Sequence, residues 1–133
     1  MTEYGKFIRT IRKERNENLM TMASKLDVSV AFLSALEVGK KQIPSNYAQR
    51  IRDIYSLNDD EFKELQESIM LTNKRVLITL DTLNNDQQNV SIAFARQINT
   101  ASQKTLEELR KILEDGEKDA STIQNRSDKH EGA

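Results

Sequence analysis

The stretch MASKLDVSVAFLSALEVGKKQIP, residues 22–44, decides the expected fold. Apolar residues at helical spacing run up to Leu26, and Asp27 then interrupts the pattern. Ser29 can cap a second helix through its hydroxyl, and Gly39 can close that helix because glycine adopts a left-handed conformation without strain. The stretch therefore predicts two short helices joined by a tight turn.

Amphipathic patterns on either side of this stretch predict three further helices. The first lies near the N-terminus, where apolar residues repeat with helical spacing: Tyr4, Phe7, Ile8 and Ile11. Pro44 opens a fourth helix. Asn58 and Glu61 form a capping box at the start of a fifth, which extends to about Leu71. Five helices are therefore expected to form a first domain over residues 1–72.

A different pattern fills residues 73–114. Residues 75–80 are apolar and rich in β-branched side chains, which predicts one strand, and two helices follow at about residues 86–99 and 102–114. A single strand requires a partner, and the simplest partner is the same strand of a second copy. The segment is thus predicted to dimerise through seven apolar residues: Val76, Leu77, Ile78, Phe94, Ile98, Leu106 and Leu109. The alternative is an extended linker followed by helices that pack on their own first domain.

Residues 115–133 form the last part of the chain. Ile123 is the one large apolar residue there, and so little apolar surface cannot offset the entropy cost of ordering, which predicts a disordered tail. The whole chain of 133 residues has four glycines and one proline, a composition typical of helical proteins. The expected fold class is mainly all-α, with five helices, one short strand and two more helices.

Composition excludes several classes of function. The chain has no cysteine and one histidine, His130 in the tail, which leaves no candidate for a disulfide, a thiolate metal site or a histidine-based catalytic centre. We expect no cofactor, no metal and no enzymatic activity, because neither a nucleophile–base set nor a glycine-rich phosphate loop occurs. No apolar run approaches the roughly 18 residues of a membrane span, so no membrane contact and a cytoplasmic location are expected.

Charge is distributed unevenly along the chain. Residues 1–55 carry ten lysines and arginines against six acidic residues, whereas residues 56–133 carry ten against fifteen. On the first helix, the face opposite the apolar stripe is basic: Lys6, Arg9, Arg12 and Lys13. Although the net charge is −1, a basic front half favours a surface that binds a polyanion. Chance variation in a charge-rich chain gives a similar imbalance.

Residues 22–44 resemble the helix-turn-helix of XRE-type regulators, the family of lambda and related phage repressors and Cro proteins. The resemblance extends over roughly residues 4–71. The positions that carry it are a small residue where the helices meet, core residues between them, and the two ends of the second helix: Ala23, Val28, Leu33, Ser29, Glu37, Gly39 and Lys40. The resemblance implies a five-helix DNA-binding domain whose second short helix enters the major groove. Glu37 is interpreted as a structural hydrogen-bonding residue, not as a catalytic acid.

The resemblance also implies which residues contact DNA. Side chains near the start of this recognition helix reach base edges: Ser29, Val30, Ala31, Ser34 and Ala35. The helix N-termini at Asn18 and Ser29 can offer backbone N–H groups to phosphates. Further contacts to the DNA backbone are implied for Lys25, Lys40, Lys41, Gln42, Ser45 and Asn46. Contacts of this kind set the register and most of the affinity.

The sequence departs from the family at the reading positions. Members commonly carry glutamine or another long polar residue where this chain has Leu19, Val30, Ala31 and Ala35. Without those amides no bidentate reading of a base is expected, but Val30 and Ala31 can pack on thymine methyl groups, and DNA shape can add discrimination. Two alternatives remain: this surface contacts a protein, or Val30 and Phe32 belong to a larger core.

Three functions are consistent with these patterns. The leading hypothesis is sequence-specific binding of double-stranded DNA by a homodimeric, nucleoid-associated transcriptional repressor on a two-fold operator. The second is an antitoxin that autoregulates its operon and holds a toxin as protein partner. The third is an adaptor or inhibitor that uses the helix-turn-helix scaffold to bind proteins only.

Overall fold

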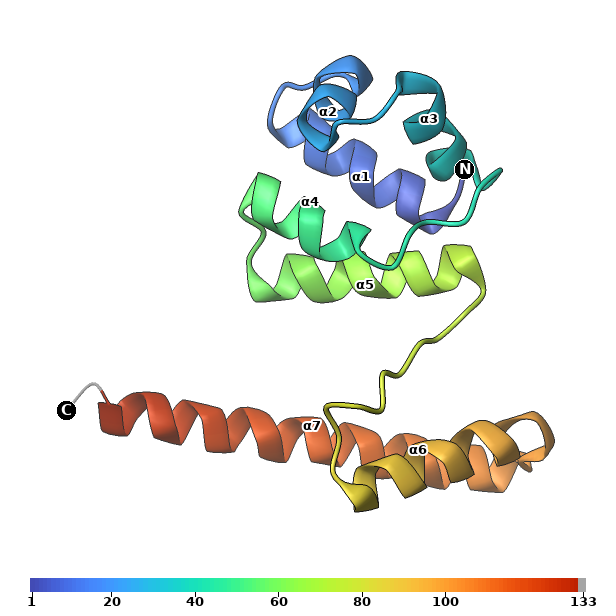
Figure 1. Cartoon of the computed structure of the whole chain (residues 1–133). Helices are drawn as coiled ribbons and strands as arrows, with labels where there is room; N and C mark the ends of the chain where they lie inside the picture. The colour runs from blue at the N-terminus through green and yellow to red at the C-terminus, as the bar shows by residue number, and fades with distance from the viewer. Residues whose placement is uncertain (132–133) are drawn as a thin grey trace. The chain divides into compact units, whose positions relative to one another are not determined.

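The structure is a computed structural model that describes residues 1–131, with side chains described up to residue 120. The described residues form helices, turns and coil without any strand, which confirms the all-α class. The chain divides into two units, one of residues 1–77 and one that begins at residue 78 (Figure 1).

Five helices make up the first unit: α1 (Glu3–Glu14), α2 (Leu19–Leu26), α3 (Val30–Val38), α4 (Tyr47–Tyr55) and α5 (Asp59–Asn73). Local signals set their starts. Ser29 Oγ accepts the Phe32 N–H at 3.0 Å at the start of α3, and Asn58 and Glu61 form the predicted capping box at the start of α5. In Figure 1, α4 and α5 lie side by side and run in opposite directions. The five predicted helices are confirmed.

The core of the first unit lies where α1 packs on α3 and α5, with α2 and α4 completing it. Its largest fully buried side chains come from all five helices: Tyr4, Ile8, Met22, Leu26, Leu33, Leu36, Ile51 and Leu65. Burying one apolar side chain of this size contributes about 1.5–3 kcal/mol. The first unit therefore has a substantial core of its own, on which a surface helix can be held in a fixed orientation.

A buried ion pair joins α1 to the last turn of α3. Arg12 Nη2 lies 2.7 Å from Glu37 Oε1, and both side chains are buried. The Glu37 carbonyl oxygen also accepts the Thr2 hydroxyl at 2.6 Å. Gly5 packs so closely on it that a Cβ there would lie 2.5 Å from the same oxygen. The structural role of Glu37 is confirmed, whereas the exposed position predicted for Arg12 is wrong, because Arg12 lies one turn after Ile8 on the buried stripe.

The end of α5 fixes two distant parts of the first unit. Thr72 Oγ1 accepts the backbone N–H of Tyr4 at 3.0 Å, near the start of α1. The side-chain amide of Asn73 accepts the Ile43 N–H at 2.9 Å and donates to the Ile43 carbonyl at 3.0 Å. The loop between α3 and α4 is therefore held from behind by the last residue of α5.

Residues 75–80 are coil, exposed as far as Thr79, and the predicted strand is not seen in this chain. Val76, Leu77 and Ile78 are 71%, 62% and 51% exposed. A β-branched apolar pattern favours an extended backbone, but a strand also requires a hydrogen-bonded neighbour. No described strand lies beside this segment; its Arg75 N–H donates to the Met70 carbonyl, and its Leu80 carbonyl accepts the Leu83 N–H. The two-stranded ribbon expected from these residues requires a second copy of the chain, and it stays a prediction.

The second unit contains α6 (Asn85–Gln97), the short 3₁₀ helix η1 (Ile98–Thr100) and α7 (Gln103–Glu131). Asn84 and Gln87 form a capping box at the start of α6. The two helices predicted for this part of the chain are confirmed. None of the side chains described for this unit, up to residue 120, is buried. In contrast to the first unit, the described part of the second unit has no buried core.

α7 is longer than the sequence pattern indicates. It continues past Glu114 to Glu131, so the disorder predicted for residues 115–133 is wrong as far as Glu131, and the last two residues lie outside the described part. Glutamate, lysine and alanine favour helix, and Gly116 costs only about 1 kcal/mol, which does not end a helix by itself.

Hydropathy gives no described helix that is by itself long and apolar enough to cross a membrane. The pair α2 and α3 meets those criteria only when both helices are counted together, and the pair is bent by 107° between them. This bend is the geometry from which the candidate site is built.

Candidate nucleic-acid interface

α2 and α3 form a helix-turn-helix. Their 107° bend lies within the roughly 90–120° typical of that motif. The turn begins at Asp27, which has a left-handed backbone with φ of 56°, a conformation that aspartate tolerates better than most residues. The N–H of Val28 donates to the Ala23 carbonyl at 3.0 Å and closes α2. Leu26 and Leu33 are fully buried on either side of the turn.

The N-termini of α2 and α3 are both capped and both exposed. Asn18 Oδ1 accepts the backbone N–H of Thr21 at 2.8 Å and its hydroxyl at 3.0 Å. Ser29 Oγ occupies the corresponding position on α3. A cap satisfies one of the free N–H groups of a first turn and leaves others that can bind an anion. Both predicted phosphate-binding helix ends are therefore open to solvent.

The residues predicted to contact bases share one end and one side of α3. Ser29, Val30 and Ala31 are exposed, and Ser34 and Ala35 are half-buried. Val30 is 41% exposed, so it lies outside the core of the first unit. Phe32, in contrast, packs against that core, with its ring edge-on to Tyr47 at 6.3 Å. The exposed end of α3 thus presents methyl groups and hydroxyls, without a long polar side chain.

The loop between α3 and α4 carries the other predicted backbone contacts, and all of them are exposed: Lys40, Lys41, Gln42, Ser45 and Asn46. The Lys41 ammonium lies 5.2 Å from the centre of the Phe32 ring, a cation–π distance. Asn73, which fixes Ile43 in this loop, was not predicted, because its partner is 30 residues away and no local signal marks the pair.

Lys25 differs from the other predicted phosphate contacts. Its ammonium is paired with the Glu17 carboxylate and lies 5.1 Å from the centre of the Tyr55 ring. Tyr55 Oη donates to the same carboxylate at 2.7 Å. Lys25, Glu17 and Tyr55 thus form a cluster that connects α2 with α4. A phosphate that bound Lys25 would have to compete with Glu17.

This cluster predicts a pH dependence of stability. Burial raises the pKa of Glu17, but hydrogen bonds from Lys25 and Tyr55 lower it more, so this pKa lies below its ordinary value. A carboxylate of this kind contributes stability above its unfolded pKa of about 4.3, and the contribution is lost as the pH falls through the lower folded value. Glu17→Gln is expected to reduce the free energy of unfolding by about 1–2 kcal/mol at pH 7. In urea titrations, the free energies of unfolding of the parent protein and of Glu17→Gln should converge towards pH 3. An equal difference at pH 7 and at pH 3 would contradict this role of Glu17.

No family model, curated protein or solved structure matches the chain. The resemblance to XRE-type regulators thus depends on the residue pattern, and it stays a prediction. Among the residues that the structure describes, no group of three histidine, cysteine, aspartate or glutamate side chains is arranged to hold a metal ion. The expectations of no cofactor and no enzymatic activity also stay predictions.

Proposed function

We propose that the protein binds double-stranded DNA sequence-specifically and acts as a transcriptional repressor in the nucleoid, as a homodimer on a two-fold operator. The observation that carries the proposal is the near-perpendicular α2–α3 pair with an exposed N-terminal end of α3. A helix about 10–12 Å wide fits the major groove, which is about 12 Å wide. α3 is the helix that enters the groove.

Within the groove, α3 reads shape and methyl groups. Val30 and Ala31 pack on thymine methyls, and the hydroxyls of Ser29 and Ser34 bond to base edges or phosphates. Lys40 and Lys41 contact phosphates on one side of the groove. Since α3 offers no bidentate amide, much of the specificity comes from DNA deformability at positions that the protein does not touch.

Dimerisation is proposed because the second unit lacks a core. Val90, Phe94, Ile98 and Leu109 line a hollow of about 450 Å³ on α6, η1 and α7, and Phe94 and Ile98 are exposed. Helices in proteins gain most of their stability from packing an apolar face, and this face is uncovered. A second copy that contributes the same helices, including Leu106 and Leu109, would bury this surface and create a shared core. Such a dimer presents two α3 helices to two half-sites.

DNA binding is expected to weaken steeply with salt. Each neutralised phosphate contributes about 0.9 to the slope of log affinity against log salt concentration. Lys40→Ala and Lys41→Ala should each lower that slope by about 0.9 and weaken binding to all sequences alike. Val30→Ala should instead weaken the binding free energy by about 1 kcal/mol, and only at preferred sites that contain thymine. Fluorescence anisotropy with sites selected from genomic fragments measures both effects.

Lys104→Ala is the matched control, because Lys104 is an exposed lysine of the second unit. It should leave the slope unchanged. A slope near zero for the parent protein, or no binding at low salt, would refute the DNA-binding proposal.

A protein-binding adaptor is the second candidate, favoured by apolar side chains on the helix-turn-helix itself. Met20 on α2 and Val38 on α3 are exposed along with Val30. Apolar patches of this kind are also typical of protein contacts. Absence of DNA binding together with capture of one defined protein partner, such as the toxin of a neighbouring gene, would favour this function or that of an antitoxin.

A further inference from the structure

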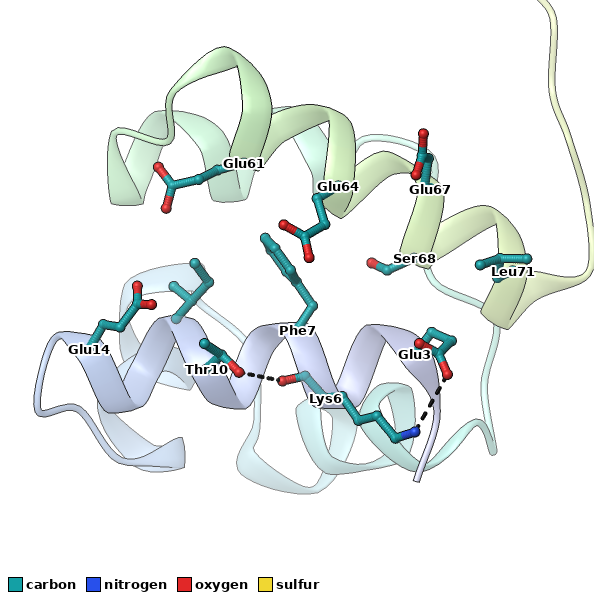
Figure 2. A pocket seen from close by; sticks show the side chains of 11 residues that line it. Glu3, Lys6, Phe7, Thr10, Glu14, Glu61, Glu64, Glu67, Ser68 and Leu71 are labelled. Atoms are coloured by element: carbon teal, nitrogen blue, oxygen red, sulfur yellow. Dashed lines mark hydrogen bonds and ion pairs between the residues drawn. The ribbon is translucent and has the colours of Figure 1, made fainter.

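An acidic groove runs between α1 and α5, with a volume of about 410 Å³ (Figure 2). Five carboxylates line it, against a single ammonium: Glu3, Glu14, Glu61, Glu64 and Glu67 against Lys6. Lys6 is itself paired with Glu3 at 3.5 Å. Phe7 and Leu71 add apolar surface to the same groove. Figure 2 shows Phe7 directed from α1 towards α5, between the carboxylates. The groove is therefore suited to a basic segment with apolar side chains.

The chain itself contains a segment with that chemistry. Lys74 and Arg75 follow α5 directly, and the apolar residues Val76, Leu77 and Ile78 come next, all of them exposed. Exposing three consecutive large apolar side chains is unfavourable, and a partner surface would relieve it.

The lengths also agree. Residues 76–80 in an extended conformation span about 17 Å. The groove follows α1, whose 12 residues span about 18 Å. We propose that residues 74–80 of one copy occupy the α1–α5 groove of a second copy, with Lys74 and Arg75 against the glutamates and Val76–Ile78 against Phe7 and Leu71.

The occupant is the second copy because the chain leaves α5 in a fixed direction. Lys74 has a left-handed backbone with φ of 56°, and the Arg75 N–H donates to the Met70 carbonyl at 3.1 Å. This cap directs the backbone that follows α5, up to residue 77, past Leu71 and away from the groove of its own unit (Figure 2). Entry into their own groove would break the cap, whereas entry into the groove of a neighbour leaves it intact.

The inference relies on the second copy proposed above, but it does not depend on DNA binding. The described residues that line the groove include none of those predicted to contact DNA. The contact can therefore be tested without DNA.

Cross-linking tests the contact directly, because the chain has no cysteine and any introduced thiol is unique. Full-length chains with Thr10→Cys, in the groove, are co-expressed with chains carrying Ile78→Cys and treated with a short bismaleimide. Thr10 and Ile78 are both exposed, so both variants should fold. We expect a cross-linked heterodimer, identified by mass spectrometry. Gln49→Cys, on an exposed position of α4 outside the groove, paired with Ile78→Cys is the matched control and should give little product.

Charge reversal provides a second measurement. Glu64→Lys, and separately Lys74→Glu with Arg75→Glu, should each weaken the dimer about twofold to fivefold per lost ion pair in sedimentation equilibrium. Combining the reversals should restore part of the affinity. The inference would be overturned if the control pair gave as much cross-linked product as Thr10→Cys with Ile78→Cys. It would also be overturned if the combined charge reversals weakened the dimer by the sum of their separate effects. A dimer without the specific cross-link refutes this contact alone, whereas a monomer refutes the dimer proposed above as well.

Discussion

Replacing Glu37 by alanine is expected to lower the free energy of unfolding of the first unit by about 3–5 kcal/mol. The substitution leaves the Arg12 guanidinium buried without its carboxylate, 2.7 Å away in the native protein, and an unpaired buried charge is costly. The chain has three tyrosines and no tryptophan, and Tyr4, Tyr47 and Tyr55 are all buried in the first unit. Urea unfolding followed by tyrosine fluorescence therefore reports on this unit alone.

The control for this experiment removes both charges together. Arg12→Met combined with Glu37→Leu should recover most of the lost stability, because apolar residues often replace a buried ion pair without net cost. Met22, whose sulfur lies 3.4 Å from Arg12 Nη1, supplies an apolar neighbour for the new side chain. A loss below about 1 kcal/mol for Glu37→Ala would show that the pair adds little, as exposed pairs do.

Phe94→Asp and Leu109→Asp are expected to convert the protein from a dimer to a monomer. Each places a carboxylate on the apolar surface around the hollow of the second unit. Loss of the dimer should also weaken binding to a two-fold operator by about 10²–10⁴-fold, because the second half-site contact is no longer intramolecular. Sedimentation and anisotropy measure the two effects on the same samples.

Asn89→Asp is the matched control for the dimer experiment. It adds the same charge to α6 at an exposed polar position, and it should leave a dimer that binds the operator normally. The tyrosine signal of the first unit should be unchanged in all three variants. A parent protein that is monomeric at tens of micromolar, or Asp variants that remain dimeric, would refute dimerisation through these helices.

Local signals explain why the first unit was predictable from sequence. The caps at Asn18, Ser29 and Asn58 lie within three residues of the N–H groups that they satisfy, so the sequence specifies where these helices start. The apolar periodicity likewise identified the buried faces. The exposed positions of Val30 and Lys40 follow from their places on these helices and on the loop between them.

Apart from the length of α7, the errors in prediction concern partners that are distant in the chain or are not found in its described part. Arg12 is buried because Glu37 meets it from α3, 25 residues later, and its place one turn after Ile8 was the signal that could have revealed this. Residues 75–80 have the composition of a strand but no neighbour to pair with among the described residues. The pairing of Lys25 with Glu17 and Tyr55 was not predicted, because it requires α2 and α4 to be already packed, and the phosphate contact expected of Lys25 stays a prediction.

The hydrogen bonds at the end of α5 determine where the chain can be cut. The predicted boundary after residue 72 lies one residue before the end of that helix. A fragment that stops at Leu71 would lose Thr72, which holds the start of α1, and Asn73, which holds the loop with Lys40 and Lys41. Such a fragment could retain its core and still lose a properly placed loop. Proteolytic or recombinant fragments of the first unit should therefore extend past Asn73. This residue is not among those predicted to contact DNA, but it holds in place the loop that carries several of them.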